Sequence, residues 1–464
     1  MTENTTTRTE RDSMGPVEVP GEALYGAQTG RALDNFPISD LRFNRRFIQA
    51  LAALKLEAAE VNLELGVIDR TKRDLIVEAA EEVVRGDHDR HFVLDIFQTG
   101  SGTSTNMNAN EVISNRAIQI AGGEVGSKDP VHPNDHVNQG QSSNDIIPTA
   151  IHLSALIGIK EDLLPALTKM QAALEAKADE FDGVVKTGRT HLQDATPIRL
   201  GQEFRGYAGQ VERGIQRVNK AAEDLAEVAL GGTAVGTGVN AKPEFSQKVC
   251  RRISRRFGVE VRETENHFQA QSAMDATVFA SGALKTVAVS FLKIANDIRF
   301  LGSGPRAGYA EIALPEVQPG SSIMPGKVNP VIAESAAMVS AQVLGNDATV
   351  AYAGASGNFE LNVMLPVIAY NLNQSVDLLA STANNLTDQC IAGLEATDRG
   401  PTLVEQGLML ATSLAPEIGY DTAAALAKEA YKEDKTIREI AREKTDLSEE
   451  KLDELLDASK MTGV

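Results

Sequence analysis

Four short segments of the chain gather hydroxyl, amide, imidazole and ammonium groups that suit anion binding and acid–base chemistry. They are SGTSTN from Ser101, HPND with the nearby SSN, the pair Thr190-His191, and the loop GSSIMPGKVNP from Gly320 to Pro330. Serine, threonine and asparagine donate hydrogen bonds, and glycine leaves backbone N–H groups open to a carboxylate. Taken singly, each of the first three segments is equally typical of a helix cap or a turn. If all four meet in space, they predict an anion site with an acid–base pair.

The loop from Gly320 to Pro330 does not have the pattern of a nucleotide-binding P-loop. A P-loop has four residues between its glycines and a hydroxyl residue directly after its lysine. Here five residues separate Gly320 from Gly326, and Val328 follows Lys327. The compact positive charge of Lys327 therefore suits a substrate carboxylate better than a nucleotide phosphate with magnesium.

A metal site is not expected from these residues. His132 and His136 lie close together in sequence, but Pro133 interrupts the segment and no third ligand follows. Cys250 and Cys390 are the only cysteines, which argues for a reducing compartment and against a disulfide framework or a zinc cluster. We expect no metal and no redox cofactor.

Composition narrows the class of protein further. The 464 residues favour two or three domains, and 42% hydrophobic with 23% charged residues is ordinary for a globular protein. The net charge of −19 argues against nucleic acid and anionic lipid as partners. The polar start of the chain lacks a signal-peptide pattern, and no long uncharged apolar stretch predicts a membrane span. We expect a cytoplasmic protein whose first ten or so residues form a disordered tail.

Long helices must position the four segments. Two apolar stripes recur at spacings of three and four residues, which places each stripe on one helix face. Further helices are predicted over 331–352 and 367–386, and Pro165 is expected to kink or divide the helix in which it falls. Helices of this length with near-heptad stripes belong in a bundle. The stripes are Leu156, Ile159, Leu163, Leu167, Met170 and Leu174, and Leu284, Val287, Phe291, Ile294, Ile298 and Leu301.

The chain divides by composition into three predicted domains. Residues 1–140 mix short helices with loops rich in glycine, asparagine and proline, and they carry the first binding loops. Residues 141–394 form the long-helix bundle and carry the loop at Gly320. Residues 395–464 alternate charged and apolar residues, as expected for a small C-terminal helical domain.

In order and wording, the four segments resemble those of the fumarase/aspartase superfamily, whose signature loop reads GSSIMPGKVNP. The similarity extends from DSMGPVEVPGEALYGAQT through GASGNFELNV to EIGYDTAAALAKEAYKE. Aspartases typically have alanine before the signature lysine and QSTND in the second segment, whereas this chain has Gly326 and QSSND. The closest resemblance is to the metal-free class II fumarases. It implies a mainly α, three-domain fold with a central helix bundle, and a homotetramer whose active sites each draw loops from three subunits.

The resemblance also implies a reaction and a role for each residue. The reaction is the reversible hydration of fumarate to (S)-malate, a tricarboxylic acid cycle step, through an aci-carboxylate intermediate. Ser321 is the base at carbon, its alkoxide is stabilised by Lys327, and His191 with Glu334 acts on water at the opposite face. The residues implied in binding the small dicarboxylate are Ser101, Thr103, Ser142, Ser143, Asn144, Thr190, Ser322, Lys327 and Asn329.

A second anion site is implied at His132, Asn134 and Asp135. Members of the family often carry a basic residue just upstream of it, where this chain has Asp129-Pro130. Three other functions stay open on the same scaffold. They are an aspartate ammonia-lyase, an argininosuccinate or adenylosuccinate lyase, and a non-catalytic relative of the kind found as lens crystallins.

Overall fold

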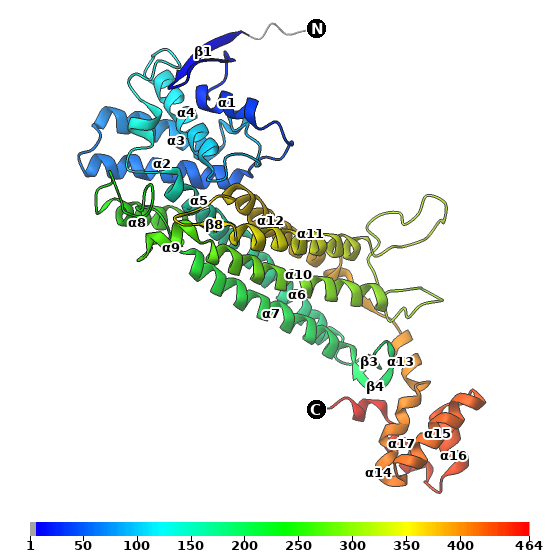
Figure 1. Cartoon of the computed structure of the whole chain (residues 1–464). Helices are drawn as coiled ribbons and strands as arrows, with labels where there is room; N and C mark the ends of the chain where they lie inside the picture. The colour runs from blue at the N-terminus through cyan, green and yellow to red at the C-terminus, as the bar shows by residue number, and fades with distance from the viewer. Residues whose placement is uncertain (1–5, 464) are drawn as a thin grey trace. The chain divides into compact units, whose positions relative to one another are not determined.

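The computed structural model describes residues 6–463, and over these residues it is mainly helical, as predicted (Figure 1). The strands of this part of the chain pair two by two into small sheets. The chain folds as two units, each built from three separate segments. Unit 1 comprises the residues up to Pro165, Gln216–Thr286 and Ala341–Ala380, and unit 2 comprises Ala166–Ile215, Val287–Ser340 and the residues from Ser381 on. The predicted division into 1–140, 141–394 and 395–464 stays a prediction.

Unit 1 is organised around α2 (Arg45–Glu64), on which α3 (Arg70–Arg85), α5 (Ser143–Gly158) and α8 (Phe245–Phe257) pack. Nearly every residue from Ala50 to Ala59 on α2 is buried, because helices cover it on several sides. The remaining helical elements of this unit are α1 (Ala27–Asn35), η1 (Asp89–His91), α4 (Thr103–Ile120), η2 (Pro133–Val137), η3 (Ile159–Leu163) and α9 (His267–Ser272). Its strands are β1 (Thr7–Asp12), β2 (Gly15–Pro20), β5 (Glu227–Val228), β6 (Arg262–Glu263), β8 (Gly357–Asn358) and β9 (Leu361–Asn362).

The expected disordered tail is wrong for residues 7–10, and its first five residues lie outside the described part of the chain. Strand β1 pairs antiparallel with β2, with Thr7 opposite Pro20 and Asp12 opposite Gly15. Arg8 holds the pair in place, because its guanidinium donates to the carbonyls of Pro20, Gly21 and Tyr25 and to the carboxylate of Glu10. The polar composition of this segment predicted disorder, but hydrogen bonds from a side chain to backbone carbonyls stabilise a hairpin there.

Unit 2 contains the hairpin of β3 (Val185–Thr190) and β4 (Gln193–Arg199) and a C-terminal group of short helices. Strands β7 (Ile312–Ala313) and β10 (Glu395–Ala396) pair and bring the start of this group to the segment after helix α10 (Asp275–Leu301). The short elements are α13 (Arg399–Glu405), η5 (Leu408–Ser413), α14 (Ala415–Ile418), α15 (Tyr420–Glu433), α16 (Ile437–Lys444), α17 (Glu449–Leu455) and η6 (Ala458–Met461), and η4 (Ile391–Gly393) precedes them. Their apolar core includes Leu410, Leu414, Leu426, Ile440 and Leu452.

The long helices confirm the predicted stripes. All twelve stripe residues are buried, so each stripe faces the interior. The predicted helices over 331–352 and 367–386 are α11 (Val331–Gly354) and α12 (Leu365–Gln389), both a few residues longer than expected. The other long helices are α6 (Leu164–Glu180), α7 (Leu200–Leu225) and α10 (Asp275–Leu301).

Pro165 is accommodated by a local change of helix type. Between α5 and α6, residues Ile159–Leu163 form a π-helical turn, in which the N–H of Leu164 donates to the carbonyl of Ile159. Such a turn re-routes the backbone bonds that a proline inside a helix cannot make. The residues on both sides, Gly158 and Leu164, keep α-helical dihedral angles. The helical path therefore continues through the proline instead of ending there.

Helix α10 is long and apolar enough to meet the length and composition test for a membrane span. However, 56% of its most apolar stretch is buried inside the protein, as is usual for a core helix. Its charged residues also have partners: Lys285 pairs with Asp347 at 2.6 Å, and Lys293 pairs with Asp297. These features fit a core helix of a bundle.

Candidate active site

The first polar cluster forms the N-terminal end of α4. Gly102 precedes the helix with φ +71°, and a Cβ there would lie 2.8 Å from Cγ2 of Ile147, so only glycine fits. The hydroxyls of Ser101 and Thr103 lie 2.8 Å apart. Free N–H groups and the positive end of the helix dipole favour an anion at this position.

The second cluster forms the N-terminal end of α5. Ser142 caps the helix, and Asp145 completes a capping box with it. The side-chain amide of Asn144 donates to the carbonyl of Ala234 at 2.8 Å, which ties it to the loop after β5. Asn106 on α4 donates to the hydroxyl of Ser143 at 3.0 Å. The structure therefore brings the first two clusters together within unit 1.

Beneath these clusters lie two buried ionisable residues, Asp145 and Lys55, that sequence reasoning missed. Asp145 is buried and accepts hydrogen bonds from the N–H groups of Ser142, Gly231 and Thr233. Burial raises the pKa of this carboxyl group. Lys55 on α2 is 0% exposed, and burial lowers the pKa of its ammonium group to about 7. The signal in the sequence is a single lysine that directly follows the apolar run ALAAL.

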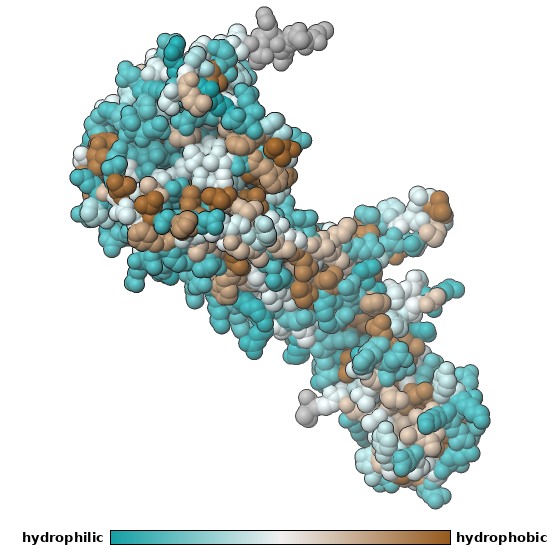
Figure 2. All heavy atoms as spheres, viewed as in Figure 1, coloured by the Kyte–Doolittle hydropathy of each residue, from teal (hydrophilic) through white to brown (hydrophobic). Residues whose placement is uncertain are grey.

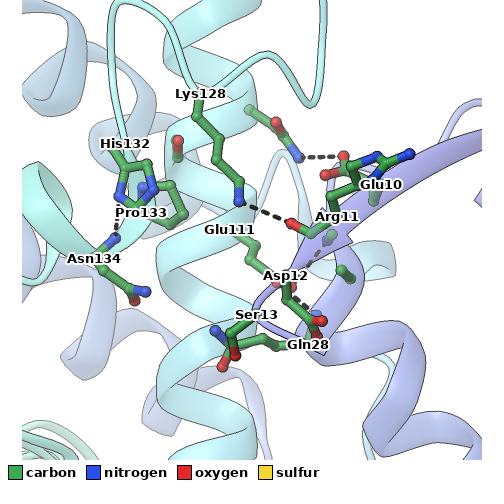
Figure 3. A pocket seen from close by; sticks show the side chains of 14 residues that line it. Glu10, Arg11, Asp12, Ser13, Gln28, Glu111, Lys128, His132, Pro133 and Asn134 are labelled. Atoms are coloured by element: carbon green, nitrogen blue, oxygen red, sulfur yellow. Dashed lines mark hydrogen bonds between the residues drawn. The ribbon is translucent and has the colours of Figure 1, made fainter. Parts of the chain in front are cut away.

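The segment around His132 borders a cavity of about 230 Å³ (Figure 3). Nδ1 of His132 accepts from the N–H groups of Asn134 and Asp135, at 3.2 and 3.1 Å, and so caps η2. His132 and Asn134 line the cavity, whereas Asp135 is exposed with its carboxylate 3.4 Å from His132 Nδ1. Lys128 also lines it, with its Nζ 2.8 Å from the carbonyl oxygen of Arg11.

Lys128 supplies the basic residue that the sequence seemed to lack upstream of His132. Lys128 lies one position before Asp129, and its side chain lines the cavity that His132 borders. The walls carry both signs of charge, because Glu10, Asp12 and Glu111 line the cavity as well (Figure 3). Glu111 is committed to α1, since its carboxylate accepts from the N–H groups at the start of that helix.

The third cluster, Thr190-His191, lies at the tip of the β3–β4 hairpin in unit 2. Thr190 pairs with Gln193, so His191 and Leu192 are the two turn residues, with φ of 58° and 61°. Positive φ at both positions is the pattern of a type I′ turn, which normally uses asparagine and glycine. The turn projects the imidazole of His191 into solvent. A strained backbone at a solvent-facing histidine is typical of a functional site.

Ion pairs hold strand β3 of this hairpin. Arg189 makes two hydrogen bonds to the carboxylate of Glu311, at 3.0 and 2.9 Å, and stacks over the ring of Tyr309 at 4.4 Å. Lys186, 1% exposed, lies 3.2 Å from the same carboxylate. A bidentate pair with a second buried cation fixes the direction of the strand that carries Thr190.

The fourth cluster is a loop that folds back on itself. A Cβ on Gly320 would lie 1.9 Å from the carbonyl oxygen of Lys327, and Asn329 donates to the carbonyl of Gly320. The hydroxyl oxygen of Ser321 accepts from the N–H groups of Ile323 and Met324, at 3.2 and 3.0 Å. The loop borders a cavity of about 440 Å³ lined by Ser321 and Lys327, among others.

The proposed acid–base pair is not joined within one chain. Among the described residues, the side chains of His191 and Glu334 form no hydrogen bond or ion pair, and Glu334 occupies the first turn of α11. Lys327 and Ser322 are exposed on the loop. Clusters three and four thus both belong to unit 2, but no bond in the described chain connects them.

Within residues 6–463, no group of three His, Cys, Asp or Glu side chains is arranged to hold a metal ion. The two cysteines are buried, and burial raises the pKa of each thiol to about 12. A thiol in that state is a poor metal ligand and a poor nucleophile. Cys250 and Cys390 therefore contribute packing to the fold.

Comparison with known proteins shows the family to which the chain belongs. A lyase family model matches residues 15–345, and a model described as the fumarase C C-terminus matches residues 410–463. The class II fumarate hydratase of Halobacterium salinarum is 55% identical over 98% of this chain and 97% of its own length. That of Neisseria meningitidis is 52% identical over 97% and 98%. The crystal structure of a class II fumarase from Schistosoma mansoni has 40% identity and a TM-score of 0.96, over 98% of this chain and 99% of that one.

The loop geometry makes a prediction about Gly320. Its replacement by alanine should force the loop open, because the new Cβ meets the backbone of Lys327 at 1.9 Å. Trypsin should then cut after Lys327 about tenfold faster or more, since cleavage follows local opening. The readout is the rate of appearance of the peptide ending at residue 327, measured by mass spectrometry.

A matched control is Gly183→Ala, at a turn where an added Cβ meets nothing within 4 Å. It should leave the cleavage rate after Lys327 unchanged. Equal cleavage rates of the wild type and Gly320→Ala would show that the close contact between Gly320 and the backbone of Lys327 does not hold the loop closed.

Proposed function

This chain belongs to the family of class II fumarate hydratases and catalyses the reversible hydration of fumarate to (S)-malate, and we propose that its four polar clusters carry that reaction. The observation on which the proposal rests is the environment of Ser321. Its hydroxyl oxygen accepts two backbone N–H groups on a loop that also carries Lys327.

Ser321 is the proposed base at carbon. The proton beside a carboxylate is very weakly acidic, and its removal leaves extra negative charge on that carboxylate. A serine oxygen can act as base only if its alkoxide form is stabilised. The N–H groups of Ile323 and Met324 point at this oxygen, and an ammonium group lies on the same loop. Preorganised donors of this kind are typically worth about 10²–10³ in rate each.

The hydroxyl group leaves or enters at the opposite face of the substrate. We assign this step to His191, acting through a water molecule and paired with Glu334. A carboxylate partner raises the basicity of an imidazole and fixes its tautomer. Because no bond joins the two residues within the described chain, the proposal places them together only in the assembled oligomer.

The substrate carboxylates are held by hydroxyl, amide and ammonium donors. The end of α4 contributes Ser101 and Thr103, and the end of α5 contributes three consecutive residues that Asn106 joins to α4. In unit 2, the hairpin tip contributes the hydroxyl of Thr190, and the loop at Gly320 contributes the remaining three residues. The full proposed set is Ser101, Thr103, Ser142, Ser143, Asn144, Thr190, Ser322, Lys327 and Asn329.

The cavity beside His132 is proposed to bind a second carboxylate ligand. Asn134, Lys128 and the imidazole offer donors there, and the backbone N–H of Asp135 donates to Nδ1 of His132 in the cap of η2. Equilibrium dialysis with radiolabelled succinate should find more than one site per chain. A stoichiometry of one would contradict this second site. Water, a proton and the dicarboxylate are the only reactants in the proposed chemistry, and a cytoplasmic location fits it.

Ser321→Ala should abolish proton transfer at carbon and spare binding. The variant removes the oxygen and keeps the glycines, the prolines and Lys327. Turnover should fall by about 10²–10⁴, the usual worth of a positioned base. The affinity for succinate should change far less. Exchange of the C3 proton of malate with deuterated solvent, followed by NMR, measures the step directly, and exchange at the wild-type rate would exclude Ser321 as the base.

His191→Asn should keep the hairpin and lose the acid–base group. Asparagine is favoured at positive φ in a type I′ turn, so the fold should be retained. Turnover should fall on the order of 10²-fold or more, because a positioned acid–base group is gone. Leu192→Gly is the matched control, since it relaxes the same turn and leaves the imidazole in place. Unchanged turnover of His191→Asn at every pH would remove the residue from the mechanism.

The assembly is proposed to be a homotetramer built on the long helices. Apolar side chains stay exposed along them in the single chain: Phe279 and Val289 on α10 are 48% and 49% exposed, and Met338 and Tyr352 on α11 are 68% and 72% exposed. Figure 2 shows apolar surface interrupting the hydrophilic surface over these helices. A chain with a net charge of −19 repels its copies, so association needs such surface.

Light scattering coupled to gel filtration should therefore give the mass of four chains. Met338→Lys should dissociate the assembly, because it buries a charge in the proposed interface. Tyr431→Lys, at a residue 79% exposed on α15, is the control and should leave the mass unchanged. A wild-type monomer that is fully active at assay concentration would overturn the proposal.

A further inference from the structure

We propose that Lys55 is a positioning residue for the dicarboxylate, because it orients Asn106 so that the hydroxyl of Ser143 must donate outward to the ligand. The inference rests on the proposed function, which places Ser143 among the binding groups. Lys55 itself is 0% exposed and does not contact the ligand. It acts through one asparagine side chain that links α2, α4 and α5.

The first step is the orientation of the asparagine amides. The ammonium group of Lys55 lies 2.6 Å from one side-chain atom of Asn106 and 2.9 Å from one of Asn138. An ammonium group has only donors, so both of these atoms must be the amide oxygens. An asparagine that faced Lys55 with its NH₂ group would bring donor against donor. The lysine thus fixes an assignment that the asparagines alone would leave free.

The second step passes this polarity to the serine. With its oxygen turned to Lys55, Asn106 presents its NH₂ group to the opposite side. That group donates to the oxygen of Asn138 at 3.1 Å and to the hydroxyl oxygen of Ser143 at 3.0 Å. The oxygen of Asn138 also accepts from Asn110 at 3.2 Å. A flipped Asn138 would therefore place its NH₂ group against several donors. Both amides are therefore locked in one direction.

The third step concerns the proton of Ser143. Its oxygen already accepts a hydrogen bond, and no acceptor for its own O–H group lies among residues 6–463. Ser143 is partly exposed at the first turn of α5, beside Ser142 and Asn144. The free O–H group is therefore directed toward the place where a carboxylate would bind. Hydrogen bonds in a chain polarise one another, so a cation at its start strengthens the donor at its end.

Burial and one nearby carboxylate act on the protonation of Lys55 in opposite directions. Asp145 on α5 is the charged group that acts on it, and α4 and the segment at Asn138 offer it only amides. Burial disfavours the ammonium form and brings its pKa to about 7, while the carboxylate opposes this effect. Asp145 is held by three backbone N–H groups, so it contributes charge without drawing Lys55 away from Asn106.

A double-mutant cycle tests the inference with succinate as the probe. Ser143→Ala should weaken succinate binding about tenfold or more, because a hydrogen bond to a charged group is lost. Lys55→Met, which keeps the length and removes the charge, should weaken binding about five- to tenfold in the wild-type background. In the Ser143→Ala background the same change should have less than a twofold effect, because its target is gone. Titration calorimetry gives the affinities.

The outcomes separate this inference from the proposed site. If Ser143→Ala leaves succinate binding unchanged, the assignment of Ser143 as a binding group is wrong, and the role of Lys55 falls with it. If Ser143→Ala weakens binding but Lys55→Met has the same effect in both backgrounds, only the inference on Lys55 is overturned. A general structural role of the lysine would give this additive result.

Two further variants guard the experiment. Lys160→Met removes an exposed lysine from η3 and should not change succinate affinity. If Lys55→Met does not fold, as judged by circular dichroism and thermal unfolding, Lys55→Leu replaces it in the same cycle. Leucine also removes both the charge and the donor to the two amide oxygens. The same non-additivity with Ser143→Ala is expected, and additive effects would overturn the inference.

Discussion

The site must hold a doubly charged anion, and then a still more negative intermediate, in a chain whose own net charge is −19. Long-range attraction cannot do this, since the field of the whole chain repels an anion. Positive potential has to be supplied locally, by groups that lose little conformational entropy when the anion binds. Helix ends, backbone N–H groups and hydroxyls meet this need, because they are already fixed before the ligand arrives. The starts of α4 and α5, joined by Asn106, and the donors around Ser321 follow this pattern.

Fixing such groups costs backbone freedom, and the structure places unusual backbone positions where the donors are needed. Gly102 and the turn of His191 have positive φ, and Gly320 approaches the backbone of Lys327 so closely that no side chain fits. Strained positions persist only if their surroundings hold them. Such support is visible for two of them: Ile147 packs over Gly102, and the ion pair of Arg189 with Glu311 holds the hairpin of His191.

The sequence predicted the long helices well, because their apolar residues recur at helical spacing and burial follows that spacing directly. It left open which of the four clusters meet within one chain. It missed the β1–β2 hairpin, whose stability comes from the contacts of Arg8 with distant carbonyls and not from a pattern of alternating residues. Lys128 was missed because it lies one position before Asp129, and only the fold shows that its side chain lines the cavity. Lys55 was missed because the sequence alone does not distinguish a buried lysine in an apolar run from one that reaches solvent.

The two lysines of the proposed site differ in a way that suits two tasks. Lys327 is exposed on a loop next to the proposed base, where a point charge can meet charge that develops during the reaction. A cation that touched both carboxylates directly would stabilise substrate and intermediate alike, which tightens binding without speeding the chemical step. Lys55 avoids this by acting through neutral groups, so that its charge sets the direction of a donor and stays away from the ligand. A buried cation and its amides thereby give an acidic protein a fixed, correctly oriented donor at the end of α5, while the stronger charge remains on the loop where the proton moves.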